Sequence, residues 1–270
     1  MTPTRQPALF VPHGAPTFAL RPGAAGAALA RHAARLGQPR AIVVVSPHWE
    51  TAIPTVGTAA RPGTIHDFHG FPAELYALRY PATGCPEAAR EVGAALEAAG
   101  LPVAYDAGRG LDHGAWVPLR MMFPDADVPV IPLSVQPHAG AAHALRVGRA
   151  LAPLRDRGLL VLGSGNVTHN LADFVHAVRG DGSTPAYVRE FADWVWARLA
   201  AGDVDALLAY RESVAAASRA HPTDEHLLPL FVALGAAGQD FTAERLHSGI
   251  DDFVLAMDAY SFDGPREIPS

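Results

Sequence analysis

Two histidines follow runs of branched apolar residues and share a similar short context. The segment VVVSPHWE, residues 43–50, carries His48, and LFVPHG, residues 9–14, carries His13. Continuous apolar runs predict strands that are covered on both faces, so each imidazole is expected where a strand ends. Ligands of open α/β sheets bind outside the carboxyl ends of the strands. Because neutral imidazole is the commonest protein metal ligand, the pattern suggests a metal site.

A third histidine, His169, lies six residues beyond the strand-like run LLVLG, in GSGNVTHNL. A single loop histidine is at least as often a residue hydrogen-bonded to the backbone as it is a metal ligand. Three histidines shortly after three predicted strands instead favour a shared site. The turn GSGN is neither a GxGxxG motif nor a P-loop, and Ser164 lacks the glycine of a nucleophile elbow. We therefore interpret this turn as the element that positions His169.

The segment HPTDEHLLPL offers His221 and His226. Five residues on one helix separate two side chains by roughly 140°, so both cannot face one ion. Pro222 and Thr223 predict a helix start, with His226 in the first turn facing inward and Pro229 bending the helix. His221 is expected in an entry loop beside the site, or as a solvated loop residue.

Further histidines occupy two long segments, 50–82 and 104–120, which are expected to be irregular loops. His113 in LDHGAW is interpreted as an active-site loop residue or part of a turn. His66 and His69 in TIHDFHGFP suggest the aromatic mouth of a pocket, with ordinary loop histidines as the alternative. The remaining histidines are interpreted as structural, and they are His32, His138, His143, His176 and His247.

Apolar runs and segments of helical period alternate along the chain, which predicts a single α/β domain with a central, mostly parallel or mixed sheet flanked by helices. A short strand is also expected after Gly100. The main predicted strands are Ala8–Pro12, Ala41–Ser46, Val128–Val135, Leu159–Gly163 and Phe253–Tyr260. The predicted helices are 23–36, 86–99, 140–155 and 186–201.

The composition excludes several classes of protein. The 270 residues are 49% hydrophobic, which supports a sizeable core, and the net charge of −6 without a basic cluster argues against nucleic-acid or anionic membrane partners. Cys85 is the only cysteine, so an intrachain disulfide and a thiolate metal site are excluded. No apolar run approaches a membrane span and no signal-peptide pattern is evident, so a cytoplasmic location is expected.

Taken in order, the motifs resemble those of a known enzyme family. LFVPHGAP, VVVSPHWE, TIHDFHGFP, LDHGAWVPL, GSGNVTHNL and PTDEHLLPL are similar to the motif set of the class III extradiol ring-cleavage dioxygenases. The resemblance is to the LigB-like members and within them to the 4,5-DOPA extradiol dioxygenase branch. It extends from about residue 8 to residue 260, and its specificity comes from the ordered set.

The resemblance implies a metal held by His13, His48 and a third ligand. In the wider family the third ligand is a carboxylate, whereas in this branch it matches His226, with the adjacent Glu225 as the fallback. Fe(II) is the implied metal, although an all-histidine site also suits Zn(II). His169 matches the acid–base residue, either with or without a direct bond to the metal, and His113 matches a second active-site histidine.

The implied reaction inserts O₂ into a catechol ring and gives a ring-opened semialdehyde. A base must remove a catechol proton and an acid must return one, and histidine, with an ordinary pKa of about 6.5, can do both. The catechol stays open between a DOPA-like amino acid, a protocatechuate-like acid and a neutral alkyl catechol. Arg61, Arg79 and Arg109 are candidate partners for a carboxylate.

Two other functions use the same residues. A zinc hydrolase on this scaffold would activate water, with Glu225 or Asp224 as the base. A non-catalytic metal-binding protein would not need His169 and His113, so their presence argues against it. The sequence carries no signal for the oligomeric state.

Overall fold

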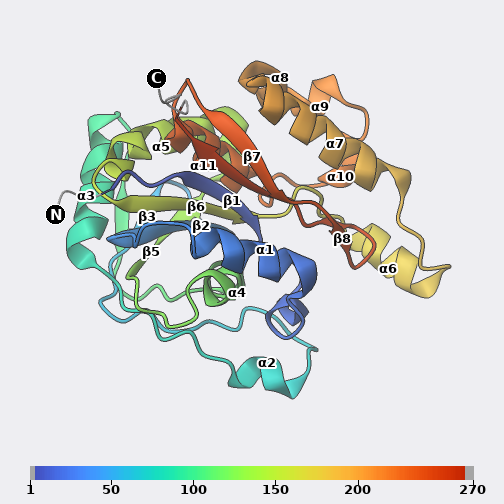
Figure 1. The fold of residues 1–270 in the computed structure, drawn as a ribbon, viewed down its shortest axis with the longest axis horizontal. Coiled ribbons are helices and arrows are strands. Elements are labelled where there is room, and N and C mark those ends of the chain that lie inside the picture. The colour runs from blue at the N-terminus through green and yellow to red at the C-terminus, as the bar shows by residue number, and fades with distance from the viewer. Residues whose placement is uncertain (1–3, 265–270) are drawn as a thin grey trace.

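The computed structural model describes residues 4–264, and its centre is an eight-stranded sheet with the order β4-β3-β5-β2-β6-β1-β10-β7 (Figure 1). The four middle strands are mutually parallel, while β3, β10 and β7 introduce antiparallel pairs. The mixed sheet confirms the predicted fold class. The strands of this sheet are β1 (Ala8–Pro12), β2 (Ala41–Glu50), β3 (Thr55–Gly57), β4 (Ala104–Asp106), β5 (Val130–Val135), β6 (Leu159–Gly165), β7 (Thr242–His247) and β10 (Ala259–Asp263), and β8 (Ile250–Asp251) pairs with β9 (Leu255–Ala256) separately.

Helices cover both faces of the sheet. The helices are α1 (Gly23–Ala33), α2 (Ala73–Ala77), α3 (Pro86–Ala98), α4 (His113–Met122), α5 (Gly140–Arg155), α6 (Leu171–Arg179), α7 (Ala186–Ala201), α8 (Val204–Leu208), α9 (Tyr210–Ser213), α10 (Ala217–Ala220) and α11 (Leu228–Ala237), with short 3₁₀ turns at Pro16–Ala19 and Pro137–Ala139. Helices α3, α5 and α11 pack in one apolar core, and α1 and α4 in the other.

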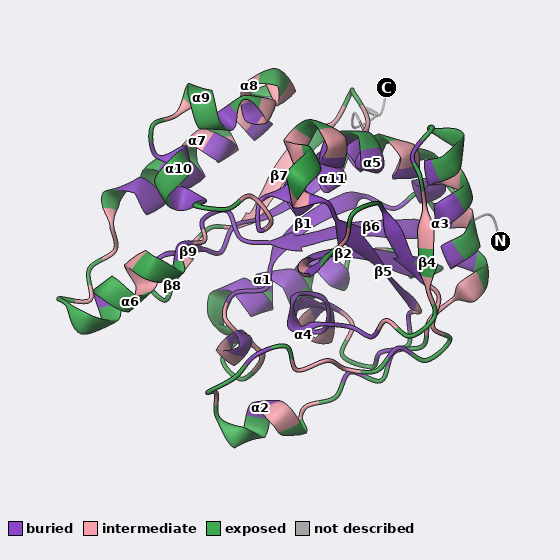
Figure 2. Cartoon of the chain, turned by 180° about the vertical axis from the view of Figure 1, so that it is seen from behind, coloured by how far each residue is buried: buried purple, intermediate pink, exposed green. Residues whose placement is uncertain are grey.

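The alternation of side chains along the strands produces these two cores. Phe10 and Val43 lie in the core with α5 and α11, whereas Leu9 and Val44 lie in the core with α1 and α4. Both sets are completely buried. The central strands therefore have to be apolar at every position, and Figure 2 shows them buried between the helical layers.

Most predicted elements are confirmed within a few residues, with three corrections. The segment Phe253–Tyr260 is not one strand, because Asp252 and Phe253 adopt positive φ in a turn and two separate strands, β9 and β10, follow. The two stretches predicted as irregular loops both contain regular elements, since 50–82 contains β3 and α2, and 104–120 contains β4 and most of α4. The third correction concerns the start of α11.

Helix α4 forms although its sequence contains a glycine and a proline. The carboxylate of Asp112 caps the helix by accepting a hydrogen bond from the backbone N–H of Ala115 at 3.1 Å. Pro118 lacks the N–H that would bond to the carbonyl of Gly114, and the Ser164 hydroxyl donates to that carbonyl instead. Tertiary contact therefore replaces the missing helical hydrogen bond.

Helix α11 begins at Leu228, so the prediction that His226 lies in its first turn is wrong. The preceding residues form a turn in which the backbone N–H of Leu227 donates to the carbonyl of Asp224 at 2.9 Å. Pro229 then occupies the first turn of the helix, where a missing N–H costs nothing. It starts the helix and does not bend it.

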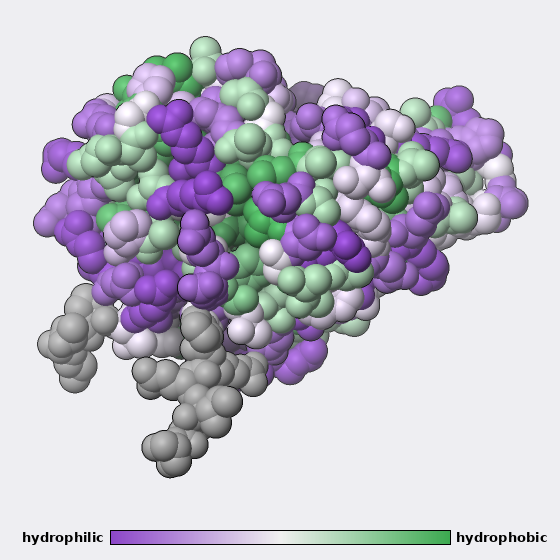
Figure 3. Space-filling view, turned by 90° about the horizontal axis from the view of Figure 1, so that it is seen from above, coloured by the Kyte–Doolittle hydropathy of each residue, from purple (hydrophilic) through white to green (hydrophobic). Residues whose placement is uncertain are grey.

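Helices α6 to α10 lie outside the layered body, with α6 extending past β8 (Figure 1). Figure 3 views the molecule from the top of Figure 1 and shows hydrophilic residues over most of that face, with a hydrophobic area near its middle. Leu171, Val175 and Val178 give α6 an exposed apolar stripe. Within residues 4–264, none of the helices combines the length and apolarity that crossing a bilayer requires.

Candidate metal centre and catalytic cavity

The parallel strands bring three of the predicted histidines to one edge of the sheet. Strands β1, β6 and β2 are neighbours, and Pro12 pairs with Gly165 while Val45 pairs with Gly163. Their carboxyl ends therefore meet, and His13, His48 and His169 arrive at the same place as the sequence predicts. His113 comes from the first turn of α4, and His226 comes from the turn before α11.

The rings of His13, His48 and His226 form a nearly equilateral triangle. Their ring centres lie 5.0, 5.3 and 5.2 Å apart. Three imidazoles that bind one ion through bonds of about 2.1 Å place their ring centres about 5 Å apart. The Nε2 atoms of His13 and His48 lie 3.2 Å apart, which also suits two ligands of one ion.

The fourth and fifth histidines lie against this triangle. The ring of His113 is centred 4.0 Å from that of His48, and ring nitrogens of His13, His48 and His113 lie within 4.8 Å of one another. The ring of His169 stacks on that of His226 at 3.5 Å with 7° between the planes. Ligand atoms of His169, His226 and Glu225 form a second group within 4.8 Å.

Hydrogen bonds orient His13 with Nε2 toward the cluster. Its Nδ1 lies 3.1 Å from the Ser164 hydroxyl, which already donates its proton to the carbonyl of Gly114. Nδ1 of His13 must therefore be the donor, and Nε2 keeps its lone pair. The amide nitrogen of Asn166 donates to this Nε2 at 3.4 Å, consistent with the same tautomer. Pro118 in α4 thus contributes indirectly to the orientation of His13, because it leaves the carbonyl of Gly114 free to accept the hydrogen bond from the Ser164 hydroxyl.

Asp67 is the most important residue that the sequence interpretation missed. Its Oδ2 accepts a hydrogen bond from Nδ1 of His113 at 2.9 Å and lies 3.6 Å from Nδ1 of His48, while Oδ1 accepts from the backbone N–H of His113 at 2.9 Å. The carboxylate favours the proton on both Nδ1 atoms, which leaves the Nε2 atoms free. The only sequence signal was its place between His66 and His69 in TIHDFHGFP.

His226 is prepared for a cation in the same manner. Its Nδ1 lies 3.0 Å from Oε1 of Glu225, which accepts the hydrogen bond. Its Nε2 is buried and has no hydrogen-bond partner among the described residues. A buried, unpartnered lone pair is costly, and a metal ion would relieve that cost. The donor set therefore fits a metal ion, with Glu225 orienting His226.

Burial favours the neutral form of four of these histidines. It lowers the pKa values of His13 and His226 well below the ordinary value, and the neighbouring histidines lower them further. Burial, followed by the charge of His113, lowers the pKa of His48 to about 3. Burial lowers the pKa of His169 to about 4, although Glu225 opposes the shift. Neutral imidazoles are the form that binds metals and accepts protons.

The five histidines lie in a cavity of about 540 Å³ with a largely apolar wall. Phe68 and Phe71 line it as the motif suggested, and Leu171 and Phe174 contribute from α6. Trp49 does not line the cavity, because it is buried with the guanidinium of Arg109 lying 4.9 Å from its ring centre. A volume and lining of this kind suit a small aromatic ligand.

Several residues singled out from the sequence are absent from this wall. They are Arg61, Arg79, Arg109, His66, His69 and Asp224. Arg109 instead pairs with Asp112, and Arg79 donates to backbone carbonyls at Tyr76 and Leu78. The carboxylate of Asp224 accepts from Tyr210 and Arg211, so it is placed as a structural residue and not as a base in the cavity.

His221 is fully buried, so its interpretation as a solvated residue is wrong. Its Nε2 donates to the carbonyl of Val167 at 2.7 Å, and its ring packs against Phe191. Burial lowers its pKa to about 4. It therefore supports, from behind, the segment that carries His169.

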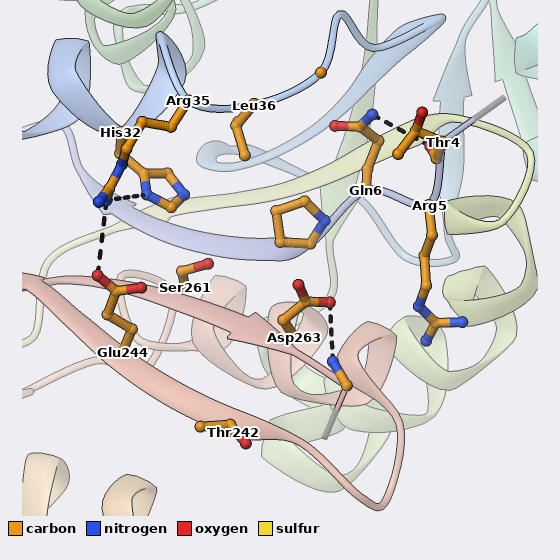
Figure 4. A pocket seen from close by; sticks show the side chains of 13 residues that line it. Thr4, Arg5, Gln6, His32, Arg35, Leu36, Thr242, Glu244, Ser261 and Asp263 are labelled. Carbon is orange, nitrogen blue, oxygen red and sulfur yellow. Dashed lines mark hydrogen bonds and ion pairs between the residues drawn. The ribbon is translucent and has the colours of Figure 1, made fainter. Parts of the chain in front are cut away.

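A second cavity, of about 300 Å³, lies at the opposite edge of the sheet, near the start of β1 (Figure 4). Arg35 lies 3.2 Å from Nδ1 of His32 and 3.7 Å from the carboxylate of Glu244 in this region. Among the described residues, the groups of three or more candidate metal ligands both lie in the first cavity and not here. The first cavity is therefore the candidate site.

Comparison with known proteins agrees with this geometry. A family model described as the catalytic LigB subunit of aromatic ring-opening dioxygenase matches residues 14–252, a range that begins one residue after His13 and includes the other four clustered histidines. The chain belongs to the LigB family. It is an enzyme of the extradiol ring-cleavage class, as the ordered motifs predicted.

Relatives of this LigB-family chain cover nearly its whole length. A protein of Beta vulgaris named 4,5-DOPA dioxygenase extradiol is 40% identical over 257 residues, covering 94% of this chain and 95% of the relative. A protein of the same name from Escherichia coli K12 is 40% identical and covers 87% of each chain. The crystal structure of an uncharacterized protein from Escherichia coli K12 superposes with a TM-score of 0.79 at 33% identity, covering 95% of this chain and 99% of that one.

Proposed function

We propose that this LigB-family enzyme binds Fe(II) through His13, His48 and His226 and cleaves the ring of a catechol, such as DOPA, beside its two hydroxyls. The observation that carries the proposal is the buried Nε2 of His226, which lacks a hydrogen-bond partner among the described residues and belongs to an even triangle of imidazoles. A metal held by these residues would offer open coordination positions at which the two catechol oxygens and O₂ could bind.

The choice of His226 over His113 as the third ligand rests on the distances between the ring centres. The ring of His113 is only 4.0 Å from that of His48 but 5.4 Å from that of His13, which is a less even arrangement about one ion. His113 also lies next to Phe68, with ring centres 5.7 Å apart, on the apolar wall where an aromatic substrate would lie. We assign it to orienting the substrate or O₂ through its Nε2.

His169 is assigned as the acid–base residue. Because burial lowers its pKa to about 4, its imidazole is neutral near pH 7 and a ring nitrogen can accept a catechol proton. Its stacking on His226 fixes the ring plane beside the proposed ligand. The same proton can return to the opening ring, which gives the semialdehyde. The aromatic wall formed by Phe68 and Phe71 would exclude water and align the catechol ring.

Oxygen uptake tests the proposal directly. The protein is purified without oxygen, loaded with Fe(II) or Zn(II), and mixed with DOPA, 4-methylcatechol and protocatechuate while O₂ and absorbance are followed. We expect stoichiometric O₂ uptake and a yellow product with Fe(II) only. His48→Ala and His226→Ala should abolish metal binding and turnover, and His169→Ala should bind metal but turn over at least 100-fold more slowly.

The exposed His138 provides a matched control, because His138→Ala removes an imidazole outside the cavity. Zinc-supported ester hydrolysis without O₂ uptake would refute the proposed reaction. Retention of stoichiometric Fe(II) by His226→Ala together with its loss from His113→Ala would refute the ligand assignment alone.

A further inference from the structure

The catalytic cavity continues into a neighbouring hollow of about 430 Å³. The two share three lining residues, namely Ala15, Thr17 and Asp252. The hollow is further lined by Arg21, which lies just after the 3₁₀ turn Pro16–Ala19. A substituent on a ring held at the histidines can therefore extend past Asp252 toward Arg21.

These two residues carry opposite charges that are not used elsewhere in the described part of the chain. Within residues 4–264, neither side chain makes a hydrogen bond or an ion pair. Arg109 and Arg79, by contrast, bind protein groups, namely the carboxylate of Asp112 and a backbone carbonyl. Partial burial, with help from the neighbouring Asp251, raises the pKa of Asp252, although the residue as a whole is exposed. Its carboxylate would therefore gain from a cationic partner.

The backbone holds Asp252 in an unusual conformation. Asp252 and Phe253 have φ values of 49° and 63° in the turn between β8 and β9. Residues other than glycine rarely adopt this left-handed region, and such conformations concentrate at functional sites. The backbone N–H of Val254 donates to the carbonyl of Asp252 at 2.7 Å, which tightens the turn at the cavity wall.

We propose that Asp252 and Arg21 form a subsite for the α-amino-acid group of the substrate, with Asp252 binding the ammonium and Arg21 the carboxylate. The inference rests on the proposed function, because it assumes that the catechol ring lies at the histidines. It makes the preferred substrate a catechol with a zwitterionic side chain. A catechol carrying only a carboxylate meets the unpaired Asp252 first and is disfavoured by like-charge repulsion.

Four catechols separate the two charges. DOPA carries both groups, dopamine only the ammonium, 3-(3,4-dihydroxyphenyl)propionate only the carboxylate, and 4-methylcatechol neither. We expect Asp252→Asn to lower kcat/KM about tenfold or more for DOPA and dopamine only. This variant should cleave the propionate as well as the wild type does or better, because the repulsion between Asp252 and the substrate carboxylate is removed. We expect Arg21→Gln to lower kcat/KM by a similar factor for DOPA and the propionate, with dopamine unaffected.

Controls remove the same charges elsewhere. Asp205→Asn and Arg31→Gln change exposed residues that line neither the catalytic cavity nor the hollow. Metal content and circular dichroism confirm that each variant is folded and loaded. A loss of equal size for all four catechols, or no loss beyond that of the controls, overturns the subsite. Failure of the wild-type enzyme to cleave any of the four catechols counts separately against the proposed function.

Discussion

Replacing Asp67 by asparagine tests whether one carboxylate prepares the metal centre. Oδ2 of Asp67 lies 2.9 Å from Nδ1 of His113 and 3.6 Å from Nδ1 of His48. Asparagine keeps the shape and can accept one hydrogen bond, but it removes the charge between the imidazoles. Burial by itself raises the pKa of Asp67, yet the hydrogen bonds and charge of His113, with the charge of His48, lower it to about 2.

The shift from an ordinary value near 3.8 to about 2 corresponds to about 2 kcal/mol of interaction with the ionised carboxylate. Loss of a carboxylate that orients a metal-binding histidine typically lowers metal affinity by about 10- to 100-fold, or about 1.4–2.7 kcal/mol. The two figures agree. The contribution of Asp67 to stability is present above pH 4 and is lost as the pH falls through about 2.

Competition between the protein and a chromophoric chelator for Co(II) measures this affinity at pH 7, with Asp205→Asn as the control. We expect Asp67→Asn to bind Co(II) at least tenfold more weakly and to alter its visible absorption bands. The free energy of unfolding of the metal-free variant should also fall by about 2 kcal/mol. Affinity and absorption bands equal to those of the wild type would refute the assigned role of Asp67.

Three further substitutions test other contacts of the site. Ser164→Ala should lower the free energy of unfolding by about 1–3 kcal/mol, because it leaves a buried carbonyl without its donor, whereas Ser218→Ala on an exposed helix should change little in the same urea titration. In Gly165→Ala the new Cβ would lie 2.3 Å from a backbone oxygen of the turn before α11, so we expect Co(II) affinity to fall at least tenfold; unchanged affinity would contradict this packing. His221→Gln keeps a donor but cannot titrate. Because the pKa of His221 falls from 6.5 unfolded to about 4 folded, wild-type stability is lost as the pH drops from 6.5 to 4, and urea titrations should show a smaller loss for His221→Gln than for His138→Gln.

The sequence identified the strands and their histidines because both signals are local. Ala8–Pro12 has the predicted bounds, since a strand covered on both faces must be apolar throughout. Parallel pairing then places His13 and His48 at one edge, which follows from the general rule for such sheets. The proline and glycine in α4 concealed that helix, because their cost is offset by Ser164, which is distant in the sequence.

Other features depended on contacts that no local pattern reveals. Asp67 lies in a segment without regular secondary structure, and its role became visible only when His113 and His48 were placed beside it. Likewise, Arg61, Arg79 and Arg109 were equally plausible partners for a substrate carboxylate in the sequence. In the structure none of the three lines the catalytic cavity, whereas Arg21 lines the hollow next to it.

By itself, the sequence determined the α/β fold, the family resemblance and the set of histidines, because hydrophobic periodicity and ordered motifs are written along the chain. Only the tertiary structure decided which nitrogen of His13, His113 and His226 faces the cluster and which charged residues line the cavity. The reason is physical, since tautomers and charge pairs are set by hydrogen bonds between residues far apart in sequence, such as His13 with Ser164 and His113 with Asp67.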